Sequence, residues 1–190
     1  RPTPILNRIS QRLDSVRRLQ EFNEVEVNAL LRASDMALTD RNLSLAEDYL
    51  RKVSGSGVRD FSSLKALCQY LIDQKRAEEL GSYIIELQER ASSKEELAQS
   101  YQIEGKYLTG KQEFRNAMRA YEKALSIREE LIEKDTTGLA SEMAIKALKA
   151  ETLTDMGIAH YRLKEYDDAQ RKHTEALVIR KDLADVSQQK

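Results

Sequence analysis

The sequence predicts an all-α protein built as an array of antiparallel helix pairs. The strongest observation is a pattern of small and large residues that occurs twice in the second half at identical offsets. Its copies are Gly105, Leu108, Phe114, Ala117, Tyr121, Ala124 and Gly157, His160, Tyr166, Ala169, His173, Ala176. Small residues at helical intervals let two helices approach closely, and two matching copies indicate a repeat array. Only two prolines and seven glycines occur among 190 residues, so long helices are permitted.

Residues 1–24 are predicted to form an N-terminal capping helix. Apolar residues recur over 5–22 at spacings of three and four, and two prolines precede them where prolines are tolerated. The polar face carries four arginines against Asp14 alone. Such a basic face is either a solvated surface or a contact surface for an acidic partner.

Residues 25–190 are predicted to contain four helix pairs. The register of the pattern extends backwards from the second half, although the first two copies are degenerate. The central position of the four pairs falls at Ala46, Leu80, Ala117 and Ala169, with separations of 34, 37 and 52 residues. The predicted repeats span about 27–58, 60–91, 94–134 and 137–186.

Turn and cap residues fall between the predicted helices. A Ser/Gly run at 54–57 ends one helix, and Asp60 or Ser62 caps the next. Ser92 and Glu95, three residues apart, are predicted to form a capping box. The last tight turn is expected at 163–165. Apolar residues keep helical spacing through the long segment before Ala169, so the helices there are expected to be longer.

The pattern resembles the tetratricopeptide repeat (TPR) family, whose unit is a 34-residue helix–turn–helix with small residues at fixed places. The resemblance is best over 97–181 and weaker over 27–90. The tryptophan expected near the start of each unit is replaced by Leu30, Leu64, Tyr101 and Leu153, and the terminal prolines are absent. The long units are similar to the extended-repeat subtype of kinesin light chains and bacterial TPR sensor proteins.

The resemblance implies a right-handed superhelix (a TPR-like α-solenoid) whose concave groove binds a peptide or helix of a partner protein. Groove residues carry over by register from the first helix of each pair. They are Leu31, Asp35, Leu38, Lys65, Gln69, Ile72, Gln102, Lys106, Thr109, Thr154, Ile158 and Tyr161. The paired Asn and Lys/Arg residues with which one family subset clamps a C-terminal carboxylate are not reproduced, so a chaperone-tail receptor is disfavoured.

Composition excludes several classes of function. The chain has 31 Lys+Arg against 32 Asp+Glu, for a net charge of −1, which argues against general nucleic-acid binding. No apolar run approaches the length of a membrane span. The single cysteine, Cys68, excludes an internal disulfide or a multi-cysteine zinc site. A reducing, cytoplasmic setting is the default expectation, and the first residue, Arg1, indicates a chain that was processed or cut from something larger.

No residue pattern predicts catalysis, so we expect a non-enzyme without a cofactor or metal. His160 and His173 stand where large aromatics are usual in the family, so we expect both to be core residues. Two histidines alone are too few for a tight zinc site. Cys68 is expected to be a buried structural thiol. Most acidic residues stand three or four positions from a basic residue, at ion-pair spacing. Glu165 and Asp168 are an exception, because this spacing pairs two like charges.

The leading hypothesis is a protein–protein interaction scaffold. The alternative is a regulatory or sensor module of a larger signalling or transcription-regulating protein. Because Leu177, Ile179 and Leu183 continue the apolar pattern to the end, the C-terminal edge is predicted to be uncapped. A homodimer through that edge is therefore a further expectation.

Overall fold

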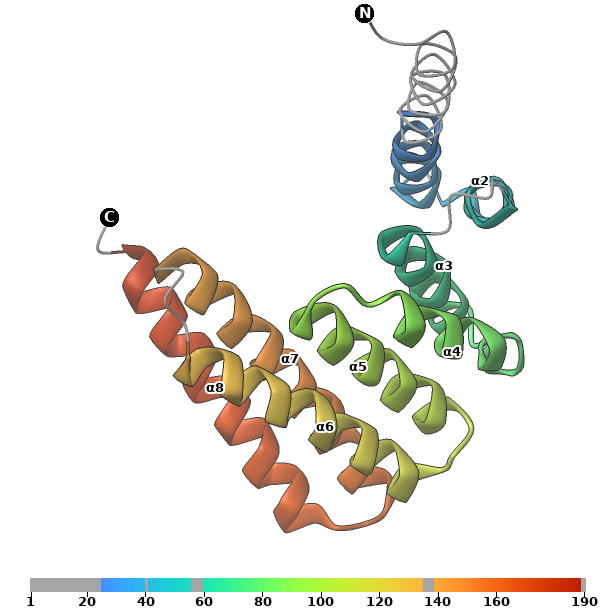
Figure 1. The fold of residues 1–190 in the computed structure, drawn as a ribbon. Helices are drawn as coiled ribbons and strands as arrows, with labels where there is room; N and C mark the ends of the chain where they lie inside the picture. Colours follow the sequence, from blue (N-terminus) through green and yellow to red (C-terminus); the bar gives the residue numbers. More distant parts are fainter. Residues whose placement is uncertain (1–24, 40, 56–59, 135–138, 189–190) are drawn as a thin grey trace, which may run out of the picture. The chain divides into compact units, whose positions relative to one another are not determined.

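The structure of the protein is a computed structural model, which describes residues 25–39, 41–55, 60–134 and 139–188. Every regular element within these residues is helical (Figure 1), so the all-α prediction is confirmed. The predicted N-terminal helix at 5–22 lies outside the described residues. The chain forms two compact units, residues 1–70 and residues 71–190.

The first unit contains a helix over 25–39, helix α2 (Leu43–Gly55) and most of helix α3 (Phe61–Asp73). The side chains of Ala46, Leu64 and Cys68 are completely buried, as expected for Ala46 and for a structural thiol. Asp60 caps α3, because its carboxylate accepts the Ser63 backbone N–H at 2.8 Å. The Tyr70 hydroxyl donates to the Leu43 carbonyl at 3.0 Å and so joins α3 to α2.

The second unit contains the remaining elements, η1 to α8. Their bounds are η1 (Ala77–Glu79), α4 (Gly81–Arg90), α5 (Lys94–Gly110), α6 (Phe114–Glu133), α7 (Leu139–Arg162) and α8 (Tyr166–Gln188). Helices α5 to α8 lie side by side (Figure 1), and α5 contacts α6, α6 contacts α7, and α7 contacts α8. The last two helices have 24 and 23 residues, which agrees with the longer helices expected there. The short 3₁₀ turn η1 was not predicted.

The core of this unit lies where α6, α7 and α8 meet. Its members are Ala117, Tyr121, Leu125, Ala150, Leu153, Met156, Ala159 and Ala176. The predicted central alanines Ala117 and Ala169 are buried, so the register of the repeat is correct. Gly105 is also buried, and a Cβ atom built on it would lie 2.3 Å from the Tyr121 ring. Glycine is therefore required there for close approach of α5 and α6.

One backbone turn recurs inside every helix pair. Among the residues that the structure describes, four non-glycine residues have positive φ, and all four lie in this turn: Arg41 (58°), Lys75 (59°), Gln112 (63°) and Lys164 (64°). Each is followed by a residue whose N–H returns to the preceding helix; for example, Glu113 donates to the Leu108 carbonyl at 2.9 Å and Glu165 donates to the His160 carbonyl at 3.0 Å. This is the C-terminal helix cap in which glycine is usual. The separations of 34, 37 and 52 residues between these turns repeat those of the central positions.

The capping box before α5 is displaced by one residue from its predicted place. The cap is Ser93, whose hydroxyl accepts the Glu96 N–H at 3.1 Å. Glu96 reaches back to the Ser92 N–H at 2.7 Å. Glu95 was assigned to this box wrongly, because its carboxylate faces α6 and binds Arg128 instead.

Candidate interaction surfaces and the buried network beneath them

The predicted groove residues fall into both units. Leu31, Asp35, Leu38, Lys65 and Gln69 belong to the first unit, and Asp35 and Leu38 are exposed there. In the second unit Ile72 is half-buried, as are Lys106, Thr109 and Thr154. Ile158 and Tyr161 are exposed, by 43% and 60%.

Several predicted groove residues form hydrogen bonds with other residues of the protein. Gln102 is only 5% exposed, and both ends of its amide are occupied by protein groups. Thr109 is hydrogen-bonded to the Tyr121 hydroxyl at 3.2 Å, and Thr154 accepts a bond from Arg180 at 2.9 Å. The side chain of Gln102 is therefore inaccessible to a partner in this structure.

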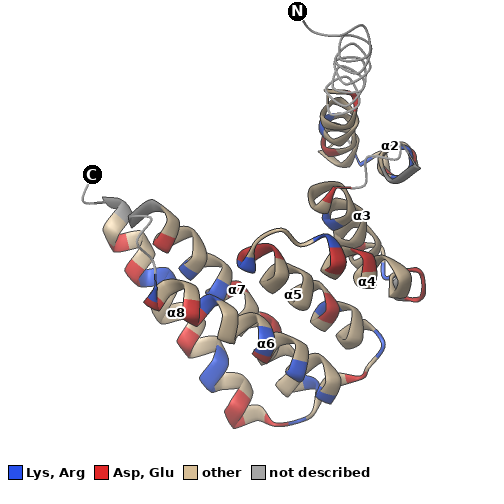
Figure 2. Ribbon diagram, viewed as in Figure 1, with Lys and Arg blue, Asp and Glu red and all other residues tan. Residues whose placement is uncertain are grey.

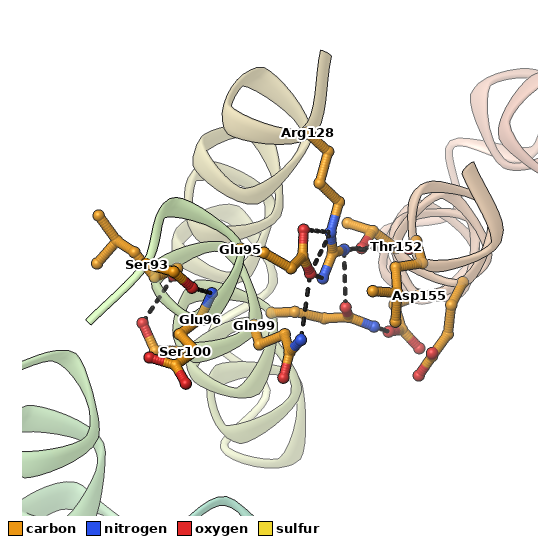
Figure 3. A network of polar contacts seen from close by, with 12 residues as sticks. Ser93, Glu95, Glu96, Gln99, Ser100, Arg128, Thr152 and Asp155 are labelled. Atoms are coloured by element: carbon orange, nitrogen blue, oxygen red, sulfur yellow. Dashed lines mark hydrogen bonds and ion pairs between the residues drawn. The ribbon is translucent and has the colours of Figure 1, made fainter. Parts of the chain in front are cut away.

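Gln102 belongs to a polar network centred on Arg128, which is fully buried at 0% exposure. Figure 3 shows Arg128 between Glu95 and Thr152. The guanidinium of Arg128 on α6 pairs with Glu95 of α5 at 3.0 Å. It also donates to the Gln102 side-chain oxygen at 2.9 Å, to the Leu148 carbonyl at 3.0 Å and to the Thr152 hydroxyl on α7. A buried charge persists only when it is paired and hydrogen-bonded. The network thus fixes α7 against the helix pair that precedes it.

A second set of charges continues the network along α5 and α7. Asp155 accepts the Gln102 amide N–H at 2.9 Å and lies 3.7 Å from the Lys106 ammonium, which also binds Glu151 at 2.9 Å. Burial raises the pKa of the Asp155 carboxyl, and the nearby Lys106 only partly offsets this. Burial opposes the charged form of Lys106, but Asp155 and Glu151 outweigh it and raise the pKa of Lys106. Lys106 is therefore held as a cation between two carboxylates.

The sequence contained a signal for the buried arginine. Arg128 stands four residues after Ala124, on the stripe that also carries Ala117 and Tyr121, so its spacing places it on the apolar face of α6. The corresponding residue of the fourth pair is Arg180, 52 residues later, and it is exposed. The position equivalent to Glu95 is Ala147, so the carboxylate partner is missing from that pair.

Three exposed apolar side chains gather around the turn between α7 and α8. They are Ile158, Tyr161 and Tyr166, and the two tyrosine rings make an edge-to-face contact with centroids 5.5 Å apart. Aromatic pairs of this geometry are attractive beyond their buried area. This surface, called here the tyrosine patch, combines predicted groove residues with an aromatic from the next helix.

The last described helix leaves a second apolar surface uncovered. Leu177 of α8 is the repeat equivalent of Leu125 of α6; Leu125 is 9% exposed, whereas Leu177 is 51% exposed. Val178 beside it is 53% exposed. Helix α7 covers α6, and no helix follows α8 within the residues that the structure describes.

The charges of the second unit are mixed rather than concentrated. Figure 2 shows lysines and arginines interspersed with acidic residues along α5 to α8. Many of them are paired between helices, as in Lys149 with Glu129 at 2.8 Å and Lys94 with Glu130 at 2.7 Å. Two lysines bind Glu130 and lower its pKa to about 2. None of the described helices is long and apolar enough to cross a lipid bilayer.

The two histidines are not the core residues that the sequence predicted. His173 is exposed, and its ring lies over Gly157, where an added Cβ would come within 2.6 Å of it. His160 is half-buried, and its Nδ1 lies 2.7 Å from the Glu165 carboxylate. The His160 side chain is only 13% exposed but is hydrogen-bonded to an exposed carboxylate, and His173 is exposed, so neither ring is fully enclosed in the core.

A search of solved structures found a similar fold in BtubC (BKLC) from P. vanneervenii. The TM-score is 0.63 at 15% sequence identity, over 92% of this chain and 76% of that chain. The chain has a TPR-like fold. The structure of MamA protein is less similar, with a TM-score of 0.45 at 15% identity over 84% of this chain and 94% of that chain. A scan against protein-family models and a search of curated proteins found no match.

Proposed function

We propose that the protein is a non-catalytic scaffold that binds a peptide or helix of a partner protein on the first-helix face of its TPR-like array. Within the second unit, this face is formed by α5 and α7. The observation that supports it best is the tyrosine patch, because Tyr161 is 60% exposed next to a second tyrosine and Ile158. Large exposed aromatics are the side chains that most often anchor a protein partner.

The polar residues of α5 and α7 also suit a fixed binding surface. Lys106, Glu151 and Asp155 are tied to one another, and Gln102 is tied to the buried Arg128. A surface whose side chains are already ordered loses less conformational entropy when it binds. In the alternative function, the chain is a regulatory module of a larger signalling protein. Binding of a partner to the same surface would then be transmitted to an effector domain.

The test uses peptides selected on the full chain from a random peptide library. Tyr161→Ala should weaken the binding of the selected peptides by about 30-fold, which corresponds to roughly 2 kcal/mol for an aromatic anchor. Ile85→Ala is the matched control, since Ile85 is 61% exposed on α4, the second helix of its pair. Peptides that bind Tyr161→Ala and the unchanged chain equally would exclude the tyrosine patch as the binding surface.

We further propose that two copies of the chain associate through the exposed surface of α8 around Leu177 and Val178. The support is the comparison with α6, where the equivalent Leu125 is covered by a neighbouring helix. Burying two such side chains on each copy removes apolar surface from water, which favours association.

The mass of the protein in solution, measured by light scattering over a range of concentrations, tests this association. The unchanged chain should shift toward twice the monomer mass as concentration rises, and Leu177→Glu should remain monomeric. Ile85→Glu adds the same charge at another exposed apolar residue and should leave the shift intact. A monomer at every concentration would contradict the proposal.

A further inference from the structure

The turn between α7 and α8 carries a side-chain cluster that the other turns of the same kind lack. Because the four turns share one backbone, the residues at three corresponding positions can be compared directly. These positions hold Ala37, Asn42 and Leu45; Leu71, Arg76 and Glu79; Leu108, Glu113 and Asn116; and His160, Glu165 and Asp168. Only the fourth turn combines an imidazole with two carboxylates.

The three side chains of the fourth turn converge. One ligand atom from each of His160, Glu165 and Asp168 lies within 4.8 Å of the others. The Nδ1 atom of His160 and the Oε2 atom of Glu165 are 2.7 Å apart, which is hydrogen-bond distance. Asp168 is held in place by Arg171, whose guanidinium lies 2.5 Å from its Oδ1 atom.

The fold itself does not require these residues. The third turn has the same positive φ, 63° at Gln112 against 64° at Lys164, and the same returning hydrogen bond. It forms this backbone with Leu108 and Asn116 at the positions of His160 and Asp168. The histidine and the second carboxylate of the fourth turn are therefore not needed to form the turn.

We propose that His160, Glu165 and Asp168 bind one Zn²⁺ ion. Imidazole nitrogen and carboxylate oxygen are both common zinc ligands, and a cation between Glu165 and Asp168 relieves the repulsion of two neighbouring carboxylates. The ion takes the place of the hydrogen bond between His160 and Glu165. Magnesium and calcium prefer sites made of oxygen alone, so the imidazole selects against them.

The surroundings of the cluster fit a three-ligand site with one open position. His160 and Asp168 also line a pocket of about 490 Å³ between α6, α7 and α8, which gives an ion access from solvent. Met118 and Met156 form part of its apolar wall. The hydrogen bond from Arg171 orients the Asp168 carboxylate, as groups around a metal ligand commonly do.

Isothermal titration calorimetry of the full chain with Zn²⁺ tests the site, with Mg²⁺ as a second titrant. The decisive variant is His160→Leu/Asp168→Asn, which gives the fourth turn the residues of the third turn and so preserves the fold. The matched control is His173→Gln, which removes the other histidine. Circular dichroism checks that both variants keep the helical content of the unchanged chain.

The unchanged chain and His173→Gln are expected to bind one Zn²⁺ per chain and to gain thermal stability from it. His160→Leu/Asp168→Asn should bind at least about tenfold more weakly, because even the loss of a group that only orients a ligand costs that much. Equal Zn²⁺ affinity in the double variant, a loss of affinity in His173→Gln, or no binding by the unchanged chain would each overturn the proposal.

Discussion

Glu95→Ala is expected to lower the free energy of unfolding by about 3 kcal/mol, the lower end of the range for a broken buried ion pair. The substitution leaves the guanidinium of Arg128 fully buried without the carboxylate that contacts it directly. The lower end applies because the Glu95 side chain is 23% exposed, so water can replace part of the lost interaction. Chemical denaturation of the full chain measures the change.

Glu129→Ala is the matched control for this prediction. Glu129 also joins α6 to α7, through Lys149, but its side chain is 52% exposed. Exposed ion pairs of this kind contribute less than about 1 kcal/mol. If the two alanine variants unfold at the same denaturant concentration, Arg128 does not depend on Glu95 and the described network is incorrect.

Gly105→Ala is expected to lower the free energy of unfolding by about 2 kcal/mol, as overpacking of a closely packed core does. The new methyl group would lie 2.3 Å from the ring of Tyr121, which is buried and whose hydroxyl is bonded to Thr109. Because the ring is only 1% exposed, it cannot move away into solvent without disturbing its neighbours. Alanine favours a helix over glycine by about 1 kcal/mol, and this gain offsets only part of the strain.

Gly157→Ala provides the comparison, because Gly157 is the repeat equivalent of Gly105. Its added methyl group would meet the ring of His173 at 2.6 Å, but His173 is exposed and can rotate toward solvent. We therefore expect stability within about 1 kcal/mol of the unchanged chain, since the helix propensity of alanine compensates for the displaced ring. Thermal unfolding of the two variants side by side measures the difference; a larger loss for Gly157→Ala would contradict the assigned packing.

Local patterns in the sequence were sufficient to predict the array of helix pairs. Ala117 and Ala169 are buried as the matching offsets predicted, and the turns after Ile72, Thr109 and Tyr161 fall where polar residues interrupt the apolar stripes. Each copy of the pattern lies within one helix pair, and comparison of two copies was enough to show the repeat. The cap before α5 was misplaced by one residue because Ser92 and Ser93 are both good caps, and only the three-dimensional contacts of Glu95 and Glu96 distinguish them.

The sequence by itself determined the fold class, the register of the helix pairs and the glycines at the close crossings of the third and fourth pairs, because all three depend on the size and polarity of residues at helical spacing. Only the tertiary structure decided which polar residues are inside. Gln102 was predicted to face a partner but is buried against Arg128, and His160 was predicted to lie in the core but meets Glu165 and Asp168 at a turn. The contact of Gln102 with Asp155 joins residues 53 positions apart, and helical periodicity carries no information at that range. The contacts of His160 cross a turn, where the helical period is interrupted.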